Sequence, residues 1–241
     1  MMLQSKSKIA DPAGNHILAA LPQAEYERIV PSLQPERLSP GSVLHESGEP
    51  LSHVYFPNTG MVSLVSPADD RSFLEVGMIG REGMVGVSAI LGLNRMPQRA
   101  IVQLPGHAMK MKLSTVKNEV KKGGKLQRLL LRSMHLLHFQ VTQSAVCNRF
   151  HSIEARLCRW LLMCRDRLNS NEVPLTQEFL SQMLGAARPM VSFAAANLQN
   201  AGIIQYSRGR ITILDPGRLK SNACECYRIV TNEYRAASLK P

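Results

Sequence analysis

The sequence lacks the long apolar segments that mark membrane and secreted proteins. No run of apolar residues approaches the 18 or so that a membrane-spanning helix needs. The first residues, MMLQSKSKIADPAGNH, contain neither the apolar centre nor the cleavage site of a signal peptide. We therefore expect a soluble, cytoplasmic protein that makes no contact with a membrane.

Cysteine is scarce and does not form a recognisable disulfide or metal framework. There are 5 cysteines, an odd number, which fits a reducing compartment. His135 and His138 are spaced for a metal or haem site, but no Cys, Asp or Glu stands near them, so packing or surface roles are favoured. Cys224 and Cys226 are two apart, and on a helix such residues face away from each other. We expect no metal and no cofactor; redox sensing by one exposed thiol stays an alternative.

Signatures of catalysis are missing as well. The chain has no phosphate-binding glycine motif, no nucleophile elbow and no His-Glu metal signature. Gly77 to Gly86 is rich in glycine, but it lies between predicted strands and is better explained by tight turns. Within it, Arg81 and Glu82 are interpreted as a solvated pair in a loop. We expect a protein that is not an enzyme.

Acidic residues are few relative to basic ones. Lys and Arg number 29 against 18 Asp and Glu, which gives a net charge of +11 and a pI near 9.8. Such a balance favours polyanionic partners, although a generic basic surface would have the same composition. The 241 residues, 44% of them hydrophobic, are enough for two domains with a core each.

Pro174 to Leu214 has the pattern of two short helices, a tight turn and a hairpin. Thr176 can cap the first helix, and Gly185 supplies the positive φ of the turn. Pro189 fits the first turn of the second helix, which runs to about Gly202. The second helix has an apolar face and an exposed face, and the apolar face consists of Val191, Ala194, Ala195 and Leu198.

A basic hairpin follows, with strands at 203–206 and 211–214 joined by Ser207-Arg208-Gly209-Arg210. The segment is thus predicted to be a winged helix-turn-helix, in which Arg188 presents a guanidinium to guanine in the major groove. Arg208 and Arg210 would contact phosphate. The alternative is that a helical hairpin and a β-hairpin only complete a hydrophobic core and bind no DNA.

The chain before this segment predicts a β-rich domain and a long helix. A helix over 21–33 precedes short strands between Arg37 and Leu113, a spacing typical of a jelly roll or small barrel whose mouth can hold a ligand. Residues 125–148, a stretch of 24, contain no Gly or Pro. Their heptads predict a dimer seam of Gln127, Leu130, Met134, Leu137, Val141, Ser144 and Asn148, with Leu126, Leu129, Leu131 and Leu136 off the seam.

A single buried helix in a monomer is the alternative for this long helix. Arg149 to Ser152 is interpreted as a hinge, followed by a helix that packs under the helix-turn-helix. Beyond the wing, residues 219–237 are predicted to form one further helix without an assigned role.

Residues 175–198, LTQEFLSQMLGAARPMVSFAAANL, and the segment RGRITILD resemble the winged helix-turn-helix of the Crp/Fnr family of bacterial transcription regulators. The resemblance implies that Thr176 contacts phosphate and that Arg188 reads guanine. Two positions depart from the family pattern. Pro189 stands where the family has a glutamate, and Phe193, which follows Ser192, stands where the family has a second basic residue that contacts bases. Proline cannot bond to a base, and phenylalanine can contact only a thymine methyl, so we expect an operator unlike the family's usual one.

The segments EPLSHVYFPNTGMVSLV and VGMIGREGMVGVSAILG resemble the family's cyclic-nucleotide-binding sensor domain. In members that bind cyclic AMP, Gly-Glu-Leu contacts the ribose and Arg-Ser-Ala the cyclic phosphate. The corresponding residues here are Gly86-Val87-Ser88 and Gln98-Arg99-Ala100. The carboxylate is missing and the arginine is displaced by one residue, which on a strand turns a side chain to the opposite face. Cyclic AMP is therefore not expected as a tight ligand, and the effector is unknown.

Together these patterns predict an α+β fold with an N-terminal jelly roll, a long central dimerisation helix and a C-terminal winged helix-turn-helix. The predicted divisions are a tail (1–16), a sensor domain (17–120), the dimerisation helix and hinge (121–150) and the DNA-binding domain (151–241). We expect a homodimer on a pseudo-palindromic site in double-stranded DNA, and the resemblance implies RNA polymerase as a partner. The alternative function is a module for a nucleotide-like ligand, whose helical domain contacts protein.

Overall fold

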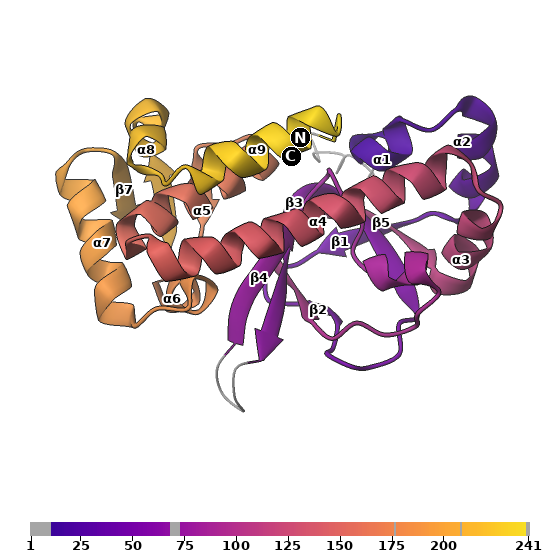
Figure 1. Cartoon of the computed structure of the whole chain (residues 1–241), viewed down its shortest axis with the longest axis horizontal. Helices are drawn as coiled ribbons and strands as arrows, with labels where there is room; N and C mark the ends of the chain where they lie inside the picture. The colour runs from indigo at the N-terminus through magenta and orange to yellow at the C-terminus, as the bar shows by residue number, and fades with distance from the viewer. Residues whose placement is uncertain (1–10, 68–72, 176, 208, 240–241) are drawn as a thin grey trace, which may run out of the picture.

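The computed structural model describes residues 11–67, 73–175, 177–207 and 209–239. The described part of the chain starts with four short helical segments, of which Figure 1 labels α1 and α2. Asn15 fixes them to the sheet, because its buried side chain caps α1 and also donates to the carbonyl oxygens of Pro57 (2.8 Å) and Gly83 (3.0 Å). The segments are η1 (Pro12–Gly14), α1 (His16–Ala19), α2 (Gln23–Ile29) and η2 (Val30–Ser32).

A five-stranded antiparallel sheet forms the N-terminal domain. Its order is β1-β5-β3-β4, with β2 also paired to β5. The strands are β1 (Gln34–Leu38), β2 (Val43–His45), β3 (His53–Pro67), β4 (Phe73–Ile79) and β5 (Arg99–Lys112). The short helix η3 (Val87–Leu91) lies between β4 and β5.

Strands β3 and β5, with 15 and 14 residues, are longer than the short strands that the sequence pattern predicts. The chain bends within them without leaving the sheet, and the register shifts between Pro57 and Val62. Glycines make the bend possible: a Cβ on Gly106 would lie 2.2 Å from the Thr59 oxygen, and Gly60 has φ +81°. The strands curl into a roll because these backbones approach more closely than side chains would permit.

Two helices connect the sheet to the C-terminal half. The first, α3 (Leu113–Lys121), was not predicted, and it packs Val116 and Val120 into the core. The second, α4 (Gly124–Phe150), extends two residues past the predicted helix at its C-terminal end. In Figure 1, α4 runs across the molecule from the N-terminal helices to the C-terminal domain.

The C-terminal domain holds the two predicted helices and the wing. It consists of α5 (Ile153–Leu168), β6 (Glu172–Pro174), α6 (Gln177–Leu184), α7 (Arg188–Asn200), β7 (Ile204–Ser207), β8 (Arg210–Ile213), α8 (Pro216–Asn222) and α9 (Cys226–Ala236). Strand β6 adds a third member to the wing, in the order β6-β8-β7. The prediction of one C-terminal helix is wrong: α8 and α9 are separate, and Ala223 between them is extended.

One hydrophobic core continues through both halves of the chain. Buried members include Phe56 and Leu104 in the roll, Leu130 and Leu136 in α4, and Leu161 in α5. The predicted fold class, a β roll with a long helix and a winged helix-turn-helix, is confirmed. Within the described ranges, no helix is long and apolar enough to cross a membrane.

Candidate nucleic-acid interface

The turn between α6 and α7 has the geometry that the sequence predicts. Gly185 has φ +55°, a conformation that favours glycine. The amide of Ala186 then donates to the Ser181 oxygen at 3.1 Å and closes the end of α6. Pro189 stands in the first turn of α7, where its missing N–H removes no helical bond. The two helices are therefore joined as in a helix-turn-helix.

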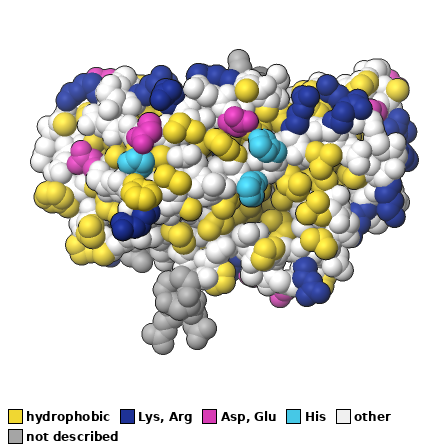
Figure 2. Space-filling model, in the orientation of Figure 1, with side chains coloured by type: hydrophobic (Ala, Val, Ile, Leu, Met, Phe, Trp, Pro, Cys, Tyr) yellow, Lys and Arg dark blue, Asp and Glu magenta, His cyan; other side chains and the backbone are white. Residues whose placement is uncertain are grey.

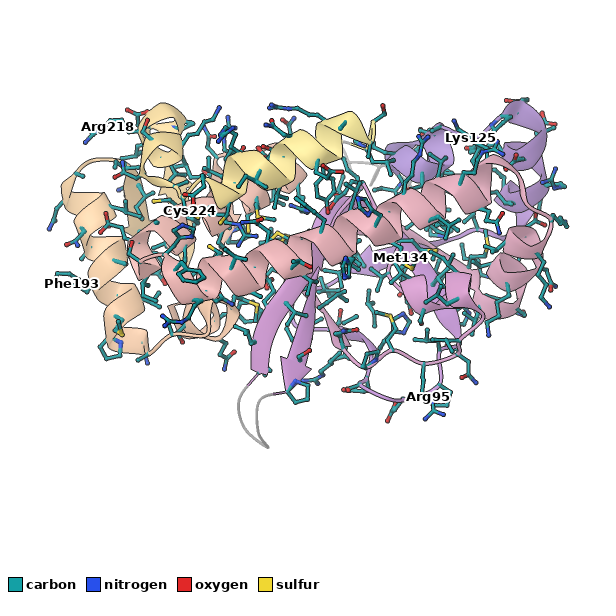
Figure 3. All side chains as sticks on the ribbon, viewed as in Figure 1. Arg95, Lys125, Met134, Phe193, Arg218 and Cys224 are labelled. Atoms are coloured by element: carbon teal, nitrogen blue, oxygen red, sulfur yellow. The ribbon has the colours of Figure 1, made fainter. Side chains whose placement is uncertain are left out.

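Helix α7 has one buried face and one exposed face. Val191 is 0% exposed and Leu198 1%, whereas Phe193 is 69% exposed and Met190 56%. Arg188 and Pro189 are exposed at the N-terminal end, and Ser192 is half-buried. Figure 3 shows Phe193 projecting outward from α7 at the end of the molecule. The surface that α7 offers thus begins with an arginine and continues with apolar side chains.

Contacts behind α7 hold this surface in place. The side-chain amide of Asn197 donates to the Glu154 carboxylate in α5 at 3.1 Å. At the other end, the amide of Ile203 donates to the Leu198 oxygen at 2.9 Å and directs the chain into β7. These contacts position the exposed face of α7 relative to α5 and the wing.

The wing carries an exposed basic side chain, Arg210. Strands β7 and β8 pair in register from Ser207–Arg210 to Ile204–Ile213. The Arg210 guanidinium lies 2.7 Å from the Glu172 carboxylate, and both side chains are more than half exposed. This pair is accessible to solvent, so a phosphate can compete with Glu172 for the arginine. Thr176 and Arg208, two further predicted contacts, lie outside the described residues.

The residues that the sequence places at a cyclic-nucleotide site lie in and next to η3 and β5. Gly86, with φ +98°, begins η3, and Val87 and Ser88 behind it are buried. Arg99 forms an ion pair with Glu46 at 2.9 Å. Ala100 next to it is 0% exposed, so the two side chains project to opposite faces of β5. Gln98 is partly exposed.

The predicted dimer seam is only partly on the surface of α4. Leu130 is 0% exposed against the N-terminal domain, so it has no surface for a second chain. Met134, Leu137, Val141 and Ser144 are half-buried. Leu131, predicted to lie off the seam, is 41% exposed. Figure 2 shows hydrophobic side chains spread over this face of the molecule.

Two groups of chemically active side chains were not predicted from the sequence. Glu75 in β4 is buried beneath Trp160 of α5. Cys147 in α4 and His151, directly after α4, lie against Cys224 and Cys226. The available signal for the second group was a Cys and a His four residues apart at the end of the long helix.

Comparison with known proteins identifies both halves of the chain. Residues 35–122 match the cyclic nucleotide-binding domain, and residues 155–221 match the Crp-like helix-turn-helix domain. The CRP-like cAMP-activated global transcriptional regulator of Mycobacterium tuberculosis is 23% identical over 198 residues, which cover 79% of this chain and 88% of that protein.

Solved structures share the whole architecture. One assigned to the Crp/Fnr family from Eubacterium rectale has a TM-score of 0.68 at 18% identity and covers 87% of this chain and 98% of its own. FixK2 from Bradyrhizobium japonicum also has a TM-score of 0.68, at 16% identity, and covers 80% and 98%. With a cyclic-nucleotide-binding-like domain, a long helix and a Crp-like helix-turn-helix in this order, the chain belongs to the Crp/Fnr family of transcription regulators.

Proposed function

We propose that the protein is a homodimeric regulator that binds a pseudo-palindromic DNA site in a sequence-specific way. The observation that carries the proposal is the exposed N-terminal end of α7, where Arg188, Met190 and Phe193 lie on the surface while the opposite face is buried. A helix presented in this way fits the major groove of B-DNA.

The side chains on α7 suggest how bases are read. Arg188 can form a bidentate bond to guanine O6 and N7. Pro189 has no donor or acceptor in its side chain, and Phe193 can pack on thymine methyl groups. Ser192 lies between them, and Arg210 on the wing contacts phosphate. We expect each half-site to contain one strongly preferred guanine followed by a preference for thymine.

Two copies would pair through α4. Since Leu130 is buried within one chain, we place the seam on Leu131, Met134, Leu137, Val141 and Ser144. Pairing of α4 across a two-fold axis would set the distance between two α7 helices at about one helical turn of DNA, roughly 34–36 Å. The regulator would act on RNA polymerase bound nearby.

The sensor domain is proposed to respond to something other than cyclic AMP. Val87 offers no acceptor for a ribose, and Glu46 already neutralises Arg99. Calorimetric titration with cyclic AMP checks this point: we expect no heat of binding at micromolar concentrations, and tight binding would contradict the assignment of Val87 and Gln98.

Selection of bound duplexes from a random DNA pool, at a fixed and stated salt concentration, tests the function. A two-fold motif with an invariant guanine in each half is the expected result. The matched control is the Arg188→Ala variant carried through the same selection, which should lose the preference at that guanine. Folded native protein that enriches no motif would count against sequence-specific binding.

A further inference from the structure

Four side chains that can ligate a metal converge at the junction of the central helix with the C-terminal segment. They are Cys147 and His151 at the end of α4, and Cys224 and Cys226 at the start of α9; their ligand atoms all lie within 4.8 Å of one another. The Sγ atoms of Cys147 and Cys224 are 3.5 Å apart. Cys226 Sγ and His151 Nδ1 are also 3.5 Å apart. Figure 3 shows Cys224 where the start of α9 approaches α4.

The backbone explains how all four point to one place. Cys147 lies in the last turn of α4, and His151 directly follows the helix, where its amide donates to the Cys147 carbonyl oxygen at 3.1 Å. Helix α8 ends at Asn222 and α9 begins at Cys226, so Cys224 precedes the helix. Cys224 and Cys226 are thus free of the helical spacing that would direct them apart. The interruption of the C-terminal helix creates the cluster.

Two of the separations between ligand atoms are close to those of a tetrahedral site for one ion. With Zn–S bonds of about 2.3 Å and Zn–N bonds of about 2.0 Å, neighbouring ligand atoms of a tetrahedron lie roughly 3.5–3.8 Å apart. The separation of 3.5 Å between Cys147 Sγ and Cys224 Sγ, and that between Cys226 Sγ and His151 Nδ1, have about this length. Three thiolates and one imidazole are a common donor set of structural zinc sites.

The surroundings of the cluster orient and balance these donors. His151 Nε2 lies 3.1 Å from the Glu225 carboxylate, which fixes the proton on Nε2 and leaves Nδ1 as a ligand toward the thiols. Histidine ligands of metals typically bond to a carboxylate in this way. The Gln143 amide donates to Cys226 Sγ at 3.0 Å.

Charge is balanced close to the cluster. Three thiolates around a divalent cation leave one negative charge, and Arg156 and Arg159 line the same cavity as Cys147. Cys147, Cys224 and Cys226 are at most 7% exposed, so water has little access to the ligands.

We propose that Cys147, His151, Cys224 and Cys226 bind one Zn²⁺ ion. Binding releases the thiol protons to solvent and leaves His151 neutral. The ion ties the C-terminal end of α4 to the chain that follows the wing, so it fixes α8 and α9 against the central helix. This inference does not depend on the proposed DNA recognition, because it concerns a site behind α7.

Metal content of the full-length protein, purified under reducing conditions without added chelator, is the first measurement. Elemental mass spectrometry, which measures the zinc content of the sample, should find one equivalent of zinc per chain. Protein stripped with a chelator and titrated with Co²⁺ should develop the intense visible bands of tetrahedral thiolate coordination, and one equivalent of Zn²⁺ should remove them.

Variants locate the ligands. Cys226→Ser should abolish stoichiometric zinc, and Glu225→Gln should weaken zinc binding about 10- to 100-fold, since Glu225 only positions His151. His135→Ala is the matched control: His135 also lies on α4 and contacts a glutamate of α9, Glu233, at 3.4 Å, but it is not part of the cluster. This variant should keep one equivalent of zinc.

The titration of stripped native protein keeps the test valid if Cys226→Ser does not fold. Folded, reduced protein that holds well under one equivalent of zinc and gives no Co²⁺ bands would overturn the proposal. If that same metal-free protein forms a Cys147–Cys224 disulfide when it is exposed to a two-electron oxidant such as oxidised glutathione, the cluster would be assigned to redox chemistry instead. Equal zinc affinity of native protein and Glu225→Gln would remove the positioning role of Glu225.

Discussion

Arg167 and Glu82 form a buried ion pair between the two halves of the protein. Arg167 Nη2 lies 2.7 Å from Glu82 Oε1, and the side chains are 1% and 3% exposed. Arg167 belongs to α5, whereas Glu82 follows β4 in the roll. The same carboxylate accepts from the amide of Gly80 at 3.1 Å, and the Arg167 guanidinium lies 5.9 Å from the ring centre of Tyr234 in α9. The pair therefore joins the roll, α5 and the C-terminal helix.

Removing one member of this pair should destabilise the protein strongly. Glu82→Gln leaves the Arg167 charge buried without its partner, which typically costs about 3–5 kcal/mol of unfolding free energy. Urea denaturation of the variant and the native protein measures the difference. The control is Glu46→Gln, because Glu46 and Arg99 are 44% and 38% exposed, and such pairs contribute about 0–1 kcal/mol. If Glu82→Gln and Glu46→Gln lowered the unfolding free energy by equal amounts, burial would not be what makes the Arg167–Glu82 pair important for stability.

Glu75 should make the unfolding free energy depend on pH. Burial raises the pKa of Glu75 to about 7. Hydrogen bonds from Ser63 and Trp160 favour the ionised carboxylate and partly oppose this effect, as do the positive charges of Arg167 and Arg159. The folded protein then keeps a proton that the unfolded chain loses near pH 4.5. The unfolded state binds fewer protons in this window, so stability falls as the pH rises from about 4.5 to 7, by roughly 3 kcal/mol in total.

Glu75→Gln tests this slope. The amide has the same shape and can accept from Trp160 Nε1, which lies 2.8 Å from Glu75 Oε1. Its unfolding free energy should lack this contribution, so the difference between variant and native protein should grow from pH 4.5 to 7 and then stay constant. Other titrating groups cancel in the difference. Parallel stability profiles from pH 4.5 to 8 would show that Glu75 is ionised in the folded state.

The helix-turn-helix could be predicted because its signals are local. Gly185 needs a positive φ, Pro189 fits a first helical turn, and Val191 and Leu198 mark the buried face; each depends on a few neighbouring residues. The long helix α4 was equally accessible, since 27 residues form it and the chain is free of proline there. Which side of α4 is buried was not predictable, because it depends on how the helix packs within the chain. Leu130, predicted to lie on the seam, is buried, whereas Leu131, predicted to lie off the seam, is exposed.

Features that depend on distant contacts were not predictable from the local pattern. Glu82 is next to glycines in a loop and resembles a solvated residue, but Arg167 covers it from 85 residues away. The break before Cys226 has neither Gly nor Pro, so the C-terminal segment was predicted as one helix. Cys224 and Cys226 were consequently placed on opposite faces, and the cluster with Cys147 and His151 was missed.

Arg188→Ala should relax the DNA specificity at one position. The loss of a bidentate contact to guanine should cost about 1–3 kcal/mol of binding free energy at that base pair in each half-site, with other positions unchanged. Fluorescence anisotropy with the best duplex and with single-base variants of it measures the effect. A variant that discriminates among these duplexes as the native protein does would remove Arg188 from base readout.

Arg210→Ala should weaken binding to all DNA sequences alike. One phosphate contact fewer lowers the slope of log K against log salt by about 0.9. Glu172→Ala is the paired control, because it frees the Arg210 guanidinium, now 2.7 Å from Glu172, and should strengthen binding without loss of specificity. If both changes weaken binding, the pair stabilises the wing and does not contact phosphate through Arg210.

If two copies pair through α4 as proposed, Leu131→Lys should convert the proposed dimer to a monomer. Leu131 is 41% exposed on α4 beside the half-buried Met134, and a lysine there brings two like charges together across a two-fold axis. Sedimentation at several protein concentrations measures the association. Leu214→Lys is the control, since Leu214 is 52% exposed next to the wing and away from α4; it should leave the dimer intact. If the Leu131→Lys protein remained dimeric, the contact between the two chains would not lie on this face of α4. The spacing of the two α7 helices would then be set by another surface.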